Sequence, residues 1–489
     1  MRYAADLPVP GLLHGRLVLS PEAHARITSI DGTAARELDG VVAVLTAADL
    51  PIVDGASGRA GQPLARDEAL WAGQPVALVV AESEAAAADG ADVVALDLEP
   101  LPAVVDVEAA MAPDSPPTRA LGGPAEASDT AAAHGGSTSG EALDDEDLSA
   151  NVIGRERQRV GDADAALAGS AATATARFST SWIHQGYLEP QVATAWVEFD
   201  GQIVISSATQ GAFACRQSVA DALGLAHDRV RVRPAPLGGG FGGKLEMLEP
   251  LVAAAALTLQ RPVRVSLPRM DDFAATNPAP GQLIELEAGA DAEGTFTGLR
   301  GRVICDRGIN DEYGTESLSA LLSAGPYTWV ARDLRAYGVL TNRVPCGAYR
   351  GPGAPPAAFA VEGLIDELAE RLGLDPIELR LRNVLREGDP GPDGQPWPVF
   401  GAAECLERVR DHPMWRDRNG HGEGEGVGMA IGYWPGGLEP TAAACRLDAD
   451  GRLTVITGAV DMSGTETTFA TIAAEAFGVP QDEVRVVAG

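Results

Sequence analysis

A glycine-rich stretch near the middle of the chain constrains its fold more than any other segment. Five glycines occupy six consecutive positions in Leu237-Gly238-Gly239-Gly240-Phe241-Gly242-Gly243-Lys244-Leu245. Glycine accepts positive φ and allows another group to approach its backbone closely, so we expect a tight turn. The alternating run 229–233 predicts a strand before this turn, and 246–259 predicts a helix after it. A strand, a glycine turn and a helix N-terminus together form a potential anion-binding site.

Lys244 is the only lysine in the chain, and the other residues among the 37 Lys and Arg are all arginine. This bias indicates a position where a compact ammonium fits and a planar guanidinium does not. The segment from Gly238 nearly matches a phosphate loop, but Leu245 stands where the hydroxyl that binds Mg²⁺ is required. Nucleotide binding is therefore a minor alternative. A glycine turn that only packs in a core is another alternative.

Composition excludes several classes of function. The formal net charge of −32 argues against nucleic acid or an anionic membrane as a partner. No apolar run is long enough to span a membrane, and the first residues lack the layout of a signal peptide. The five cysteines have no C-x-x-C spacing, which favours a reducing cytoplasm and excludes an iron–sulfur cluster held by such a motif. The seven histidines form no metal-binding pair, so we expect no metal held by protein side chains.

The pattern of apolar residues predicts a multi-domain α+β protein. Residues 1–108 alternate strand-like and helix-like runs, which predicts a small α/β domain with a short helix capped by Ser83. Residues 109–160 are rich in Pro, Gly, Ser and acidic residues, which predicts a linker. The block 161–414 contains a predicted hairpin and two predicted helices, one over 356–372 stopped at Gly373 and one that starts at Asp375-Pro376 and runs to 385. The block 415–489 is expected to begin with a strand at 426–433. No internal repeat is evident.

Four segments carry a family resemblance when they are considered together. In order they are Ala208–Gly211, Gly238–Lys244, Ala348–Gly353 and Arg382–Asp389. In this order and spacing they resemble the molybdopterin-binding large subunit of the xanthine dehydrogenase/aldehyde oxidase family, the molybdenum hydroxylases. Residues 182–190 also resemble that family, and 11–107 resemble its α/β hammerhead domain. The resemblance implies a hammerhead domain followed by molybdopterin-binding α+β domains, of which the last is incomplete.

The resemblance also implies a cofactor and the residues around it. The family holds molybdenum through a pterin dithiolene, of which the cytosine dinucleotide is one form, rather than through side chains. By position, Gln210 resembles the glutamine that hydrogen-bonds a metal ligand, and Arg350 resembles the arginine that orients substrate or stabilises charge on it. The implied cofactor-binding residues are Gly239, Gly240, Phe241, Gly242 and Gly243, together with Ser463 and Gly464 from a turn at 458–465.

Several departures from the family pattern bear on the substrate. Leu245 and Leu318 stand where xanthine-type enzymes have a glutamate and an arginine, which implies a more apolar substrate. Pro352 replaces a stacking phenylalanine, and Tyr433 and Trp434 could supply an aromatic wall instead. The turn at 458–465 lacks the family's usual glutamine, so its side-chain amide is absent.

The family's catalytic glutamate lies in a Gly-Glu motif beyond any match to Gly489. We therefore expect the front part of a cytoplasmic large subunit that is inactive alone and is completed by a C-terminal chain. The complete enzyme would oxidise an aldehyde or N-heterocycle with water-derived oxygen, and partner subunits would carry a 2Fe-2S cluster and FAD. A catalytically inactive scaffold or cofactor-carrier half-subunit is the alternative.

Overall fold

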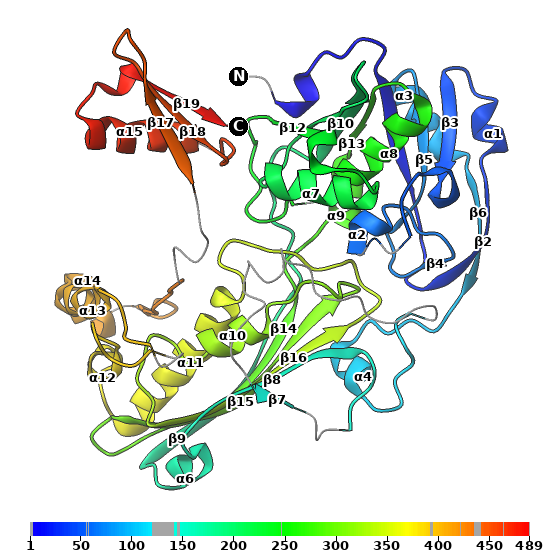
Figure 1. Cartoon of the computed structure of the whole chain (residues 1–489). Helices are drawn as coiled ribbons and strands as arrows, with labels where there is room; N and C mark the ends of the chain where they lie inside the picture. The colour runs from blue at the N-terminus through cyan, green and yellow to red at the C-terminus, as the bar shows by residue number, and fades with distance from the viewer. Residues whose placement is uncertain are drawn as a thin grey trace.

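The computed structural model describes residues 3–54, 56, 58–119, 141–143, 147–245, 247–391, 395–420, 422–434, 442–462 and 464–488. It is an α+β protein with two large sheets and two small ones. Figure 1 shows the green helices α7 and α8 beside the blue N-terminal strands, with the second large sheet below them. Within the described residues, no helix is long and apolar enough to cross a membrane.

The first large sheet has seven strands in the order β12-β11-β10-β13-β1-β5-β3. Its strands are β1 (Leu13–Leu19), β3 (Val41–Thr46), β5 (Pro75–Ala81), β10 (Val192–Val197), β11 (Ile203–Ser207), β12 (Val230–Pro234) and β13 (Val263–Ser266). Strand β1 pairs in parallel with β13, beginning at Leu13 opposite Val263. One sheet therefore joins the first block of the sequence to the second. The periodicity predicted the individual strands but did not reveal this pairing.

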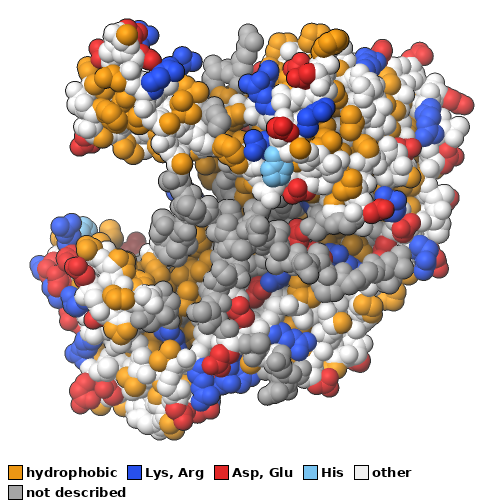
Figure 2. Space-filling model, in the orientation of Figure 1, with side chains coloured by type: hydrophobic (Ala, Val, Ile, Leu, Met, Phe, Trp, Pro, Cys, Tyr) orange, Lys and Arg blue, Asp and Glu red, His pale blue; other side chains and the backbone are white. Residues whose placement is uncertain are grey.

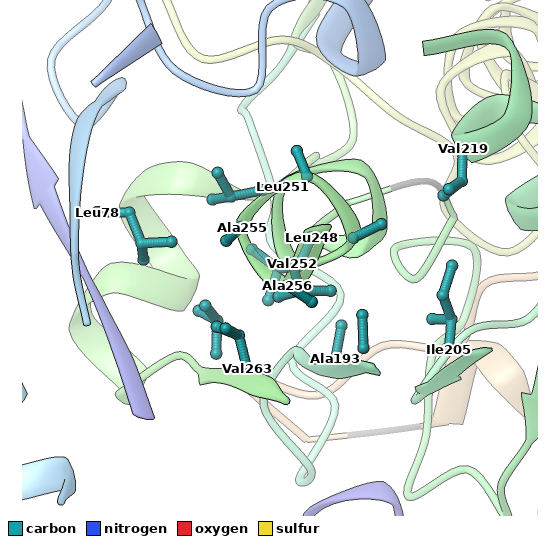
Figure 3. Close-up of a cluster of buried hydrophobic side chains, with 14 of the residues drawn as sticks. Leu78, Ala193, Ile205, Val219, Leu248, Leu251, Val252, Ala255, Ala256 and Val263 are labelled. Carbon is teal, nitrogen blue, oxygen red and sulfur yellow. The ribbon is translucent and has the colours of Figure 1, made fainter. Parts of the chain in front are cut away.

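Helix α8 (Glu249–Leu259) forms the centre of the core beside this sheet. Its residues from Glu249 to Ala256 are all buried, as expected for a helix that is apolar on every side. Figure 3 shows Leu251, Val252 and Ala256 between Leu78 and Val263 on one side and Ala193 and Ile205 on the other. The predicted helix at 246–259 thus begins at Glu249 and ends where expected. Helix α7 (Ala212–Ala222) contributes to the same cluster.

The remaining described elements of the first block are a small sheet and four helices. The sheet has the order β4-β2-β6, with β2 (Ala25–Asp31), β4 (Glu68–Ala69) and β6 (Ala95–Pro100). The helices are α1 (Thr33–Arg36), α2 (Gly58–Gly61), α3 (Glu84–Asp92) and α4 (Val107–Met111). Ser83 caps α3 by accepting a hydrogen bond from Ala86 N, as its place before the helix predicted.

The second large sheet has six strands in the order β7-β8-β16-β15-β14-β9. Its strands are β7 (Glu141–Ala142), β8 (Val152–Val160), β9 (Ala172–Thr180), β14 (Gln282–Ala290), β15 (Phe296–Gly308) and β16 (Ala331–Leu340). Strands β14 and β15 form the predicted hairpin. Strand β8 lies inside 109–160, so the prediction of a linker is wrong for this part. Its polar run 155–159 has no apolar alternation that would predict a strand, and the strand forms because its backbone pairs with β16.

Helices α10 (Glu316–Leu322), α11 (Ala354–Leu372) and α12 (Pro376–Asn383) pack with this sheet in one core. Helix α11 ends at Gly373, which has φ +65°, and Asp375 caps α12 by accepting hydrogen bonds from Ile377 N and Glu378 N. Both boundaries agree with the sequence prediction. The remaining helices are α6 (Ala163–Ala168), α9 (Arg269–Ala275), α13 (Ala402–Asp411) and α14 (Pro413–Arg416).

The strand predicted at 426–433 is not formed. Val427, Met429 and Ile431 pack against the core of the six-stranded sheet, as their alternation predicted. Ile431 N, however, donates to the carboxylate of Glu362 rather than to another strand. Among the described residues, this segment is extended without a neighbouring strand. The alternation thus identified the buried side chains but not the backbone partner.

The last part of the chain forms a three-stranded sheet with the order β17-β18-β19 and one helix. The elements are β17 (Ala443–Leu447), β18 (Leu453–Thr457), α15 (Thr465–Phe477) and β19 (Val484–Ala488). Leu447, Ile472 and Phe477 are exposed in this unit. Figure 2 shows hydrophobic side chains over much of its surface, at the upper left.

This unit repeats the arrangement of β10, β11, α7 and β12. In both, two antiparallel strands are followed by a helix and then by a strand parallel to the second. Asp200-Gly201 and Asp450-Gly451 form the same turn, with Asp carboxylates that accept from Gln202 N and Arg452 N. The structure therefore contains an internal repeat that the sequence did not reveal. The connections before the two helices differ in length, which obscures the alignment.

A buried ion pair in α11 and α12 provides a test of this packing. Arg380 is fully buried and donates to Glu362 Oε2 (2.8 Å) and Asp366 Oδ1 (2.8 Å). We predict that Arg380→Met lowers the free energy of unfolding by about 3–5 kcal/mol, because Glu362 stays buried without its cation. Arg382→Met, at an exposed position of the same helix, should change it by less than about 0.5 kcal/mol. Urea unfolding measures both, and equal effects would contradict this role.

Candidate cofactor-binding site

The two ends of the glycine loop 238–244 are joined by one carboxylate. Glu189 Oε2 accepts hydrogen bonds from Gly238 N (2.8 Å) and from Lys244 Nζ (2.9 Å). The Lys244 side chain is fully buried, and its ammonium lies 4.7 Å from the centroid of the Tyr187 ring. Burial lowers the pKa of Lys244, whereas the hydrogen bond and charge of Glu189 act in the opposite direction. The compact ammonium predicted for this position therefore forms an internal ion pair that connects the loop to Glu189.

This geometry contradicts the phosphate-loop alternative. The Lys244 ammonium is directed to Glu189 beneath the loop, so it is not presented to a bound phosphate. The expected anion site at the following helix is also not formed. Buried Glu249, the first residue of α8, accepts from Met247 N (2.8 Å) and Ser207 Oγ (2.6 Å). A carboxylate of the chain itself therefore occupies the N-terminus of α8.

Gln210 is hydrogen-bonded directly to the glycine loop. Its Oε1 accepts from Gly242 N (2.8 Å) and Lys244 N (3.3 Å), and its backbone N donates to Lys244 O (2.8 Å). No described residue accepts a hydrogen bond from the other side-chain atom, Nε2. The side chain is half-buried. Its amide NH₂ is thus available to a ligand at the loop.

The segment that carries Arg350 lies against the same loop. Arg350 N donates to Phe241 O (2.9 Å), and Gln185 Nε2 donates to Ala348 O (2.7 Å). A Cβ on Gly242 would lie 2.6 Å from Ala348 O, so this close approach requires glycine. The Arg350 side chain is exposed and forms no ion pair with any residue that the structure describes. Its charge therefore remains available next to the loop.

The apex of the loop offers backbone donors. The N–H groups of Gly239, Gly240 and Phe241 have no hydrogen-bond acceptor among the described residues. Phe241 has φ +53°, a strained conformation for a residue with a side chain, and its ring is exposed. Successive free N–H groups in such a turn suit an oxygen-rich or anionic group. The loop therefore fits a ligand of that kind by its own geometry.

The turn at 458–465 meets the base of the loop. Leu237 N donates to Asp461 O (2.9 Å), and Leu237 forms a parallel bridge with Met462. Gly464 has φ +100° and immediately precedes α15. Ser463 lies outside the described residues. This turn and the connection 208–211 occupy equivalent places in the two repeated units, and both are bonded to the glycine segment.

Comparison with known proteins identifies the domains of the chain. A molybdopterin cofactor-binding domain matches residues 145–384, a second such domain matches 405–489, and the a/b hammerhead domain of aldehyde oxidase and xanthine dehydrogenase matches 1–102. The chain belongs to the molybdenum hydroxylase family. It is 33% identical to the xanthine dehydrogenase molybdenum-binding subunit of Escherichia coli O157:H7, over 99% of this chain and 65% of that subunit.

Two solved structures of molybdenum hydroxylases are similar to the whole chain. Aldehyde oxidoreductase from Desulfovibrio gigas superimposes with a TM-score of 0.87 at 28% identity, over 100% of this chain and 54% of that one. Quinoline 2-oxidoreductase from Pseudomonas putida 86 superimposes with a TM-score of 0.84 at 30% identity, over 100% of this chain and 64% of that one. The chain thus spans between about half and two thirds of the length of these family members.

The predicted pocket residues lie in two places. Leu245 lies near Gln210, and the other four lie in or near the segment that follows Arg350. Leu245 lies beside Gly211, next to Gln210. Leu318 is buried in a cluster with Leu322, Ala354 and Ala357, against which Tyr433 packs. Trp434 lies beside Gly351, the residue after Arg350. Pro352 is half-buried in the same turn.

Three important residues of the site were not identified from the sequence, namely Gln185, Glu189 and Gln191. Gln191 Nε2 donates to Gly243 O (2.9 Å), and fully buried Asp272 accepts from Gln191 N (3.1 Å) and Arg269 Nη1 (2.7 Å). All three lie in or just after the segment 182–190, which resembles the family. The available signal was the presence of three long polar side chains within the seven residues 185–191.

Gly242 provides a test of this close packing. Gly242 has φ +101° and would place a Cβ 2.6 Å from Ala348 O, whereas Gly373 has φ +65° and has no atom within 4 Å. We predict that Gly242→Ala lowers the free energy of unfolding by about 2–5 kcal/mol. Gly373→Ala should lower it by only about 1–2 kcal/mol. Hydrogen exchange at Arg350 N should accelerate in Gly242→Ala alone, and unchanged exchange there would contradict the packing.

Proposed function

We propose that this chain holds a molybdenum–pterin cofactor at the glycine loop and orients the substrate of a molybdenum hydroxylase. One observation carries the proposal. Gln210 and Arg350 are separated widely in sequence, yet each is hydrogen-bonded to the two-residue segment Phe241-Gly242. The two residues that the family resemblance marks as functional therefore lie at one loop.

The residues around the loop fit such a cofactor. The free N–H groups of Gly239, Gly240 and Phe241 would hold its polar atoms, and Gln210 Nε2 would donate to a ligand of the metal. No cluster of three or more His, Cys, Asp or Glu that could bind a metal occurs in the described residues, which suits a metal carried by an organic cofactor. Gly464 and Ser463 are proposed to contact the pterin from the second repeated unit. When bound, the cofactor would supply two-electron oxidation.

Arg350 is proposed to act on the substrate. Its guanidinium is permanently protonated and would hold a carbonyl oxygen or ring nitrogen and stabilise negative charge that develops there. Trp434 beside Gly351, together with Tyr433 and Pro352, would form the wall against an aromatic substrate. Leu245 and Leu318 make the surroundings apolar. An aldehyde or an apolar N-heterocycle is the proposed substrate, hydroxylated with oxygen from water.

Family members named for xanthine, quinoline and an aldehyde support this substrate class. Glu189 is bound to Lys244, so it is not proposed as the general base. We assign the 2Fe-2S cluster and FAD to partner subunits. The dinucleotide form of the pterin and a cytoplasmic location are proposed on the same family basis.

The test uses the native complex purified from its host, with molybdenum measured by mass spectrometry and turnover measured with benzaldehyde and quinoline. We predict that Arg350→Lys lowers kcat/KM by about 100-fold or more at unchanged molybdenum content. Arg386→Lys, another exposed arginine, should change kcat/KM by less than about twofold. A native complex that contains molybdenum but turns over no aldehyde or N-heterocycle would favour the role of a cofactor carrier. A complex without molybdenum would favour the role of a scaffold.

A further inference from the structure

A groove of about 670 Å³ separates the edges of two sheets. One side is formed by β12, the outermost strand of the seven-stranded sheet, and by the start of α7. The other side includes residues 485–487 of β19, the outermost strand of the small C-terminal sheet. Figure 1 shows these strands in the upper part of the molecule. They are the equivalent strands of the two repeated units, so the repeat brings two sheet edges to one groove.

Both edges lack a strand partner within the described residues. Strand β12 pairs only with β11, and β19 pairs only with β18. The outward N–H and C=O groups of an edge strand can bind an added strand, and natural proteins usually cover or shorten such edges. The two edges therefore offer backbone hydrogen bonds to an extended segment in the groove.

The charge of the groove differs from that of the whole chain. Its lining includes Arg216, Arg231, Arg233 and Arg485, against only Asp228 and Glu466. The chain as a whole has a formal net charge of −32. None of the four arginines forms an ion pair within 4.0 Å with a residue that the structure describes. Arg485 interacts electrostatically with Asp448, so Arg216, Arg231 and Arg233 are the arginines that favour a negatively charged occupant.

The spacing of the arginines further defines the occupant. Arg231 and Arg233 are exposed and two residues apart on β12, so they project from one face of the strand. The guanidinium of Arg233 lies 5.4 Å from the centroid of the Trp196 ring, which supports its side chain without neutralising it. Arg485 follows Val484 in β19 as Arg231 follows Val230 in β12. Two charges at alternate positions match carboxylates at alternate positions of an extended peptide.

We propose that this groove binds an extended acidic polypeptide segment as an added strand along β12, with its carboxylates facing Arg231 and Arg233. A second copy of the chain is disfavoured at this edge, because pairing of β12 with itself would place arginines against arginines. The proposal concerns a partner surface and does not depend on the cofactor at the glycine loop.

The test measures binding of a labelled peptide of alternating Val and Glu to the full chain by fluorescence anisotropy at low ionic strength. We expect saturable binding that Arg231→Glu with Arg233→Glu weakens at least tenfold. The control pair Arg382→Glu with Arg408→Glu makes the same change of charge at exposed positions of α12 and α13 and should weaken binding less than twofold. Circular dichroism verifies that each variant is folded.

Two further peptides test the mode of binding on the unaltered protein. A peptide of alternating Val and Lys should not bind, and N-methylation of alternate residues of the Glu peptide should weaken binding at least tenfold. Inorganic phosphate at matched ionic strength should not displace the Glu peptide. The proposal is overturned by the absence of saturable binding, by equal binding of the N-methylated peptide, by full displacement with phosphate, or by a folded arginine variant that binds normally.

Discussion

The carboxylate of Glu189 joins Gly238 N and Lys244 Nζ, and the rest of the site depends on this connection. Lys244 is fully buried, so its ammonium loses hydration, which the hydrogen bond to Glu189 and the Tyr187 ring replace in part. Removing one partner of such a pair lowers the stability of the fold by far more than the intact pair adds to it, because the other charge stays buried alone. The connection therefore fixes the ends of a glycine loop that would otherwise have many conformations.

With its ends fixed, the loop is positioned by contacts that leave no space for side chains. A Cβ on Gly240 would meet Gln210 Oε1 at 2.4 Å, and one on Gly243 would meet the Gln185 amide at 2.6 Å. These contacts lie on the protein side of the loop, and the N–H groups of 239–241, which have no acceptor within the described part of the chain, remain for a ligand. The two repeated units add equivalent connections from either side, one with Gln210 and one with Asp461. The glycine content thus serves close packing more than flexibility.

Sequence patterns predicted those features that local chemistry determines. Ser83, Gly373 and Asp375 mark helix ends by capping and backbone conformation, and they do so in the structure. Features that depend on distant partners were missed. Strand β8 contains four charged residues and becomes a strand because β16 supplies its hydrogen bonds, whereas 426–433 has the right alternation but no neighbouring strand in the described chain. The repeat was missed because the residues its units share, such as Val230-Arg231-Val232 and Val484-Arg485-Val486, are few and are separated by connections of unequal length.

The candidate site shows the same contrast between features that the sequence predicts and features that depend on distant partners. The family resemblance placed Gln210 and Arg350 at the loop, and both are hydrogen-bonded to it. The direction of Lys244 could not be predicted, since its partner Glu189 lies far away in the sequence and nothing local indicates an inward side chain. Likewise, only the fold shows that Glu249 occupies the helix terminus expected to bind an anion.

The most direct test of the central claim is to locate molybdenum by anomalous X-ray scattering in crystals of the native complex. The account predicts a single molybdenum peak beside the backbone of Phe241, within reach of Gln210 Nε2 through one ligand of the metal. A molybdenum peak remote from this loop, or a fully loaded complex in which the loop contacts no cofactor, would contradict it.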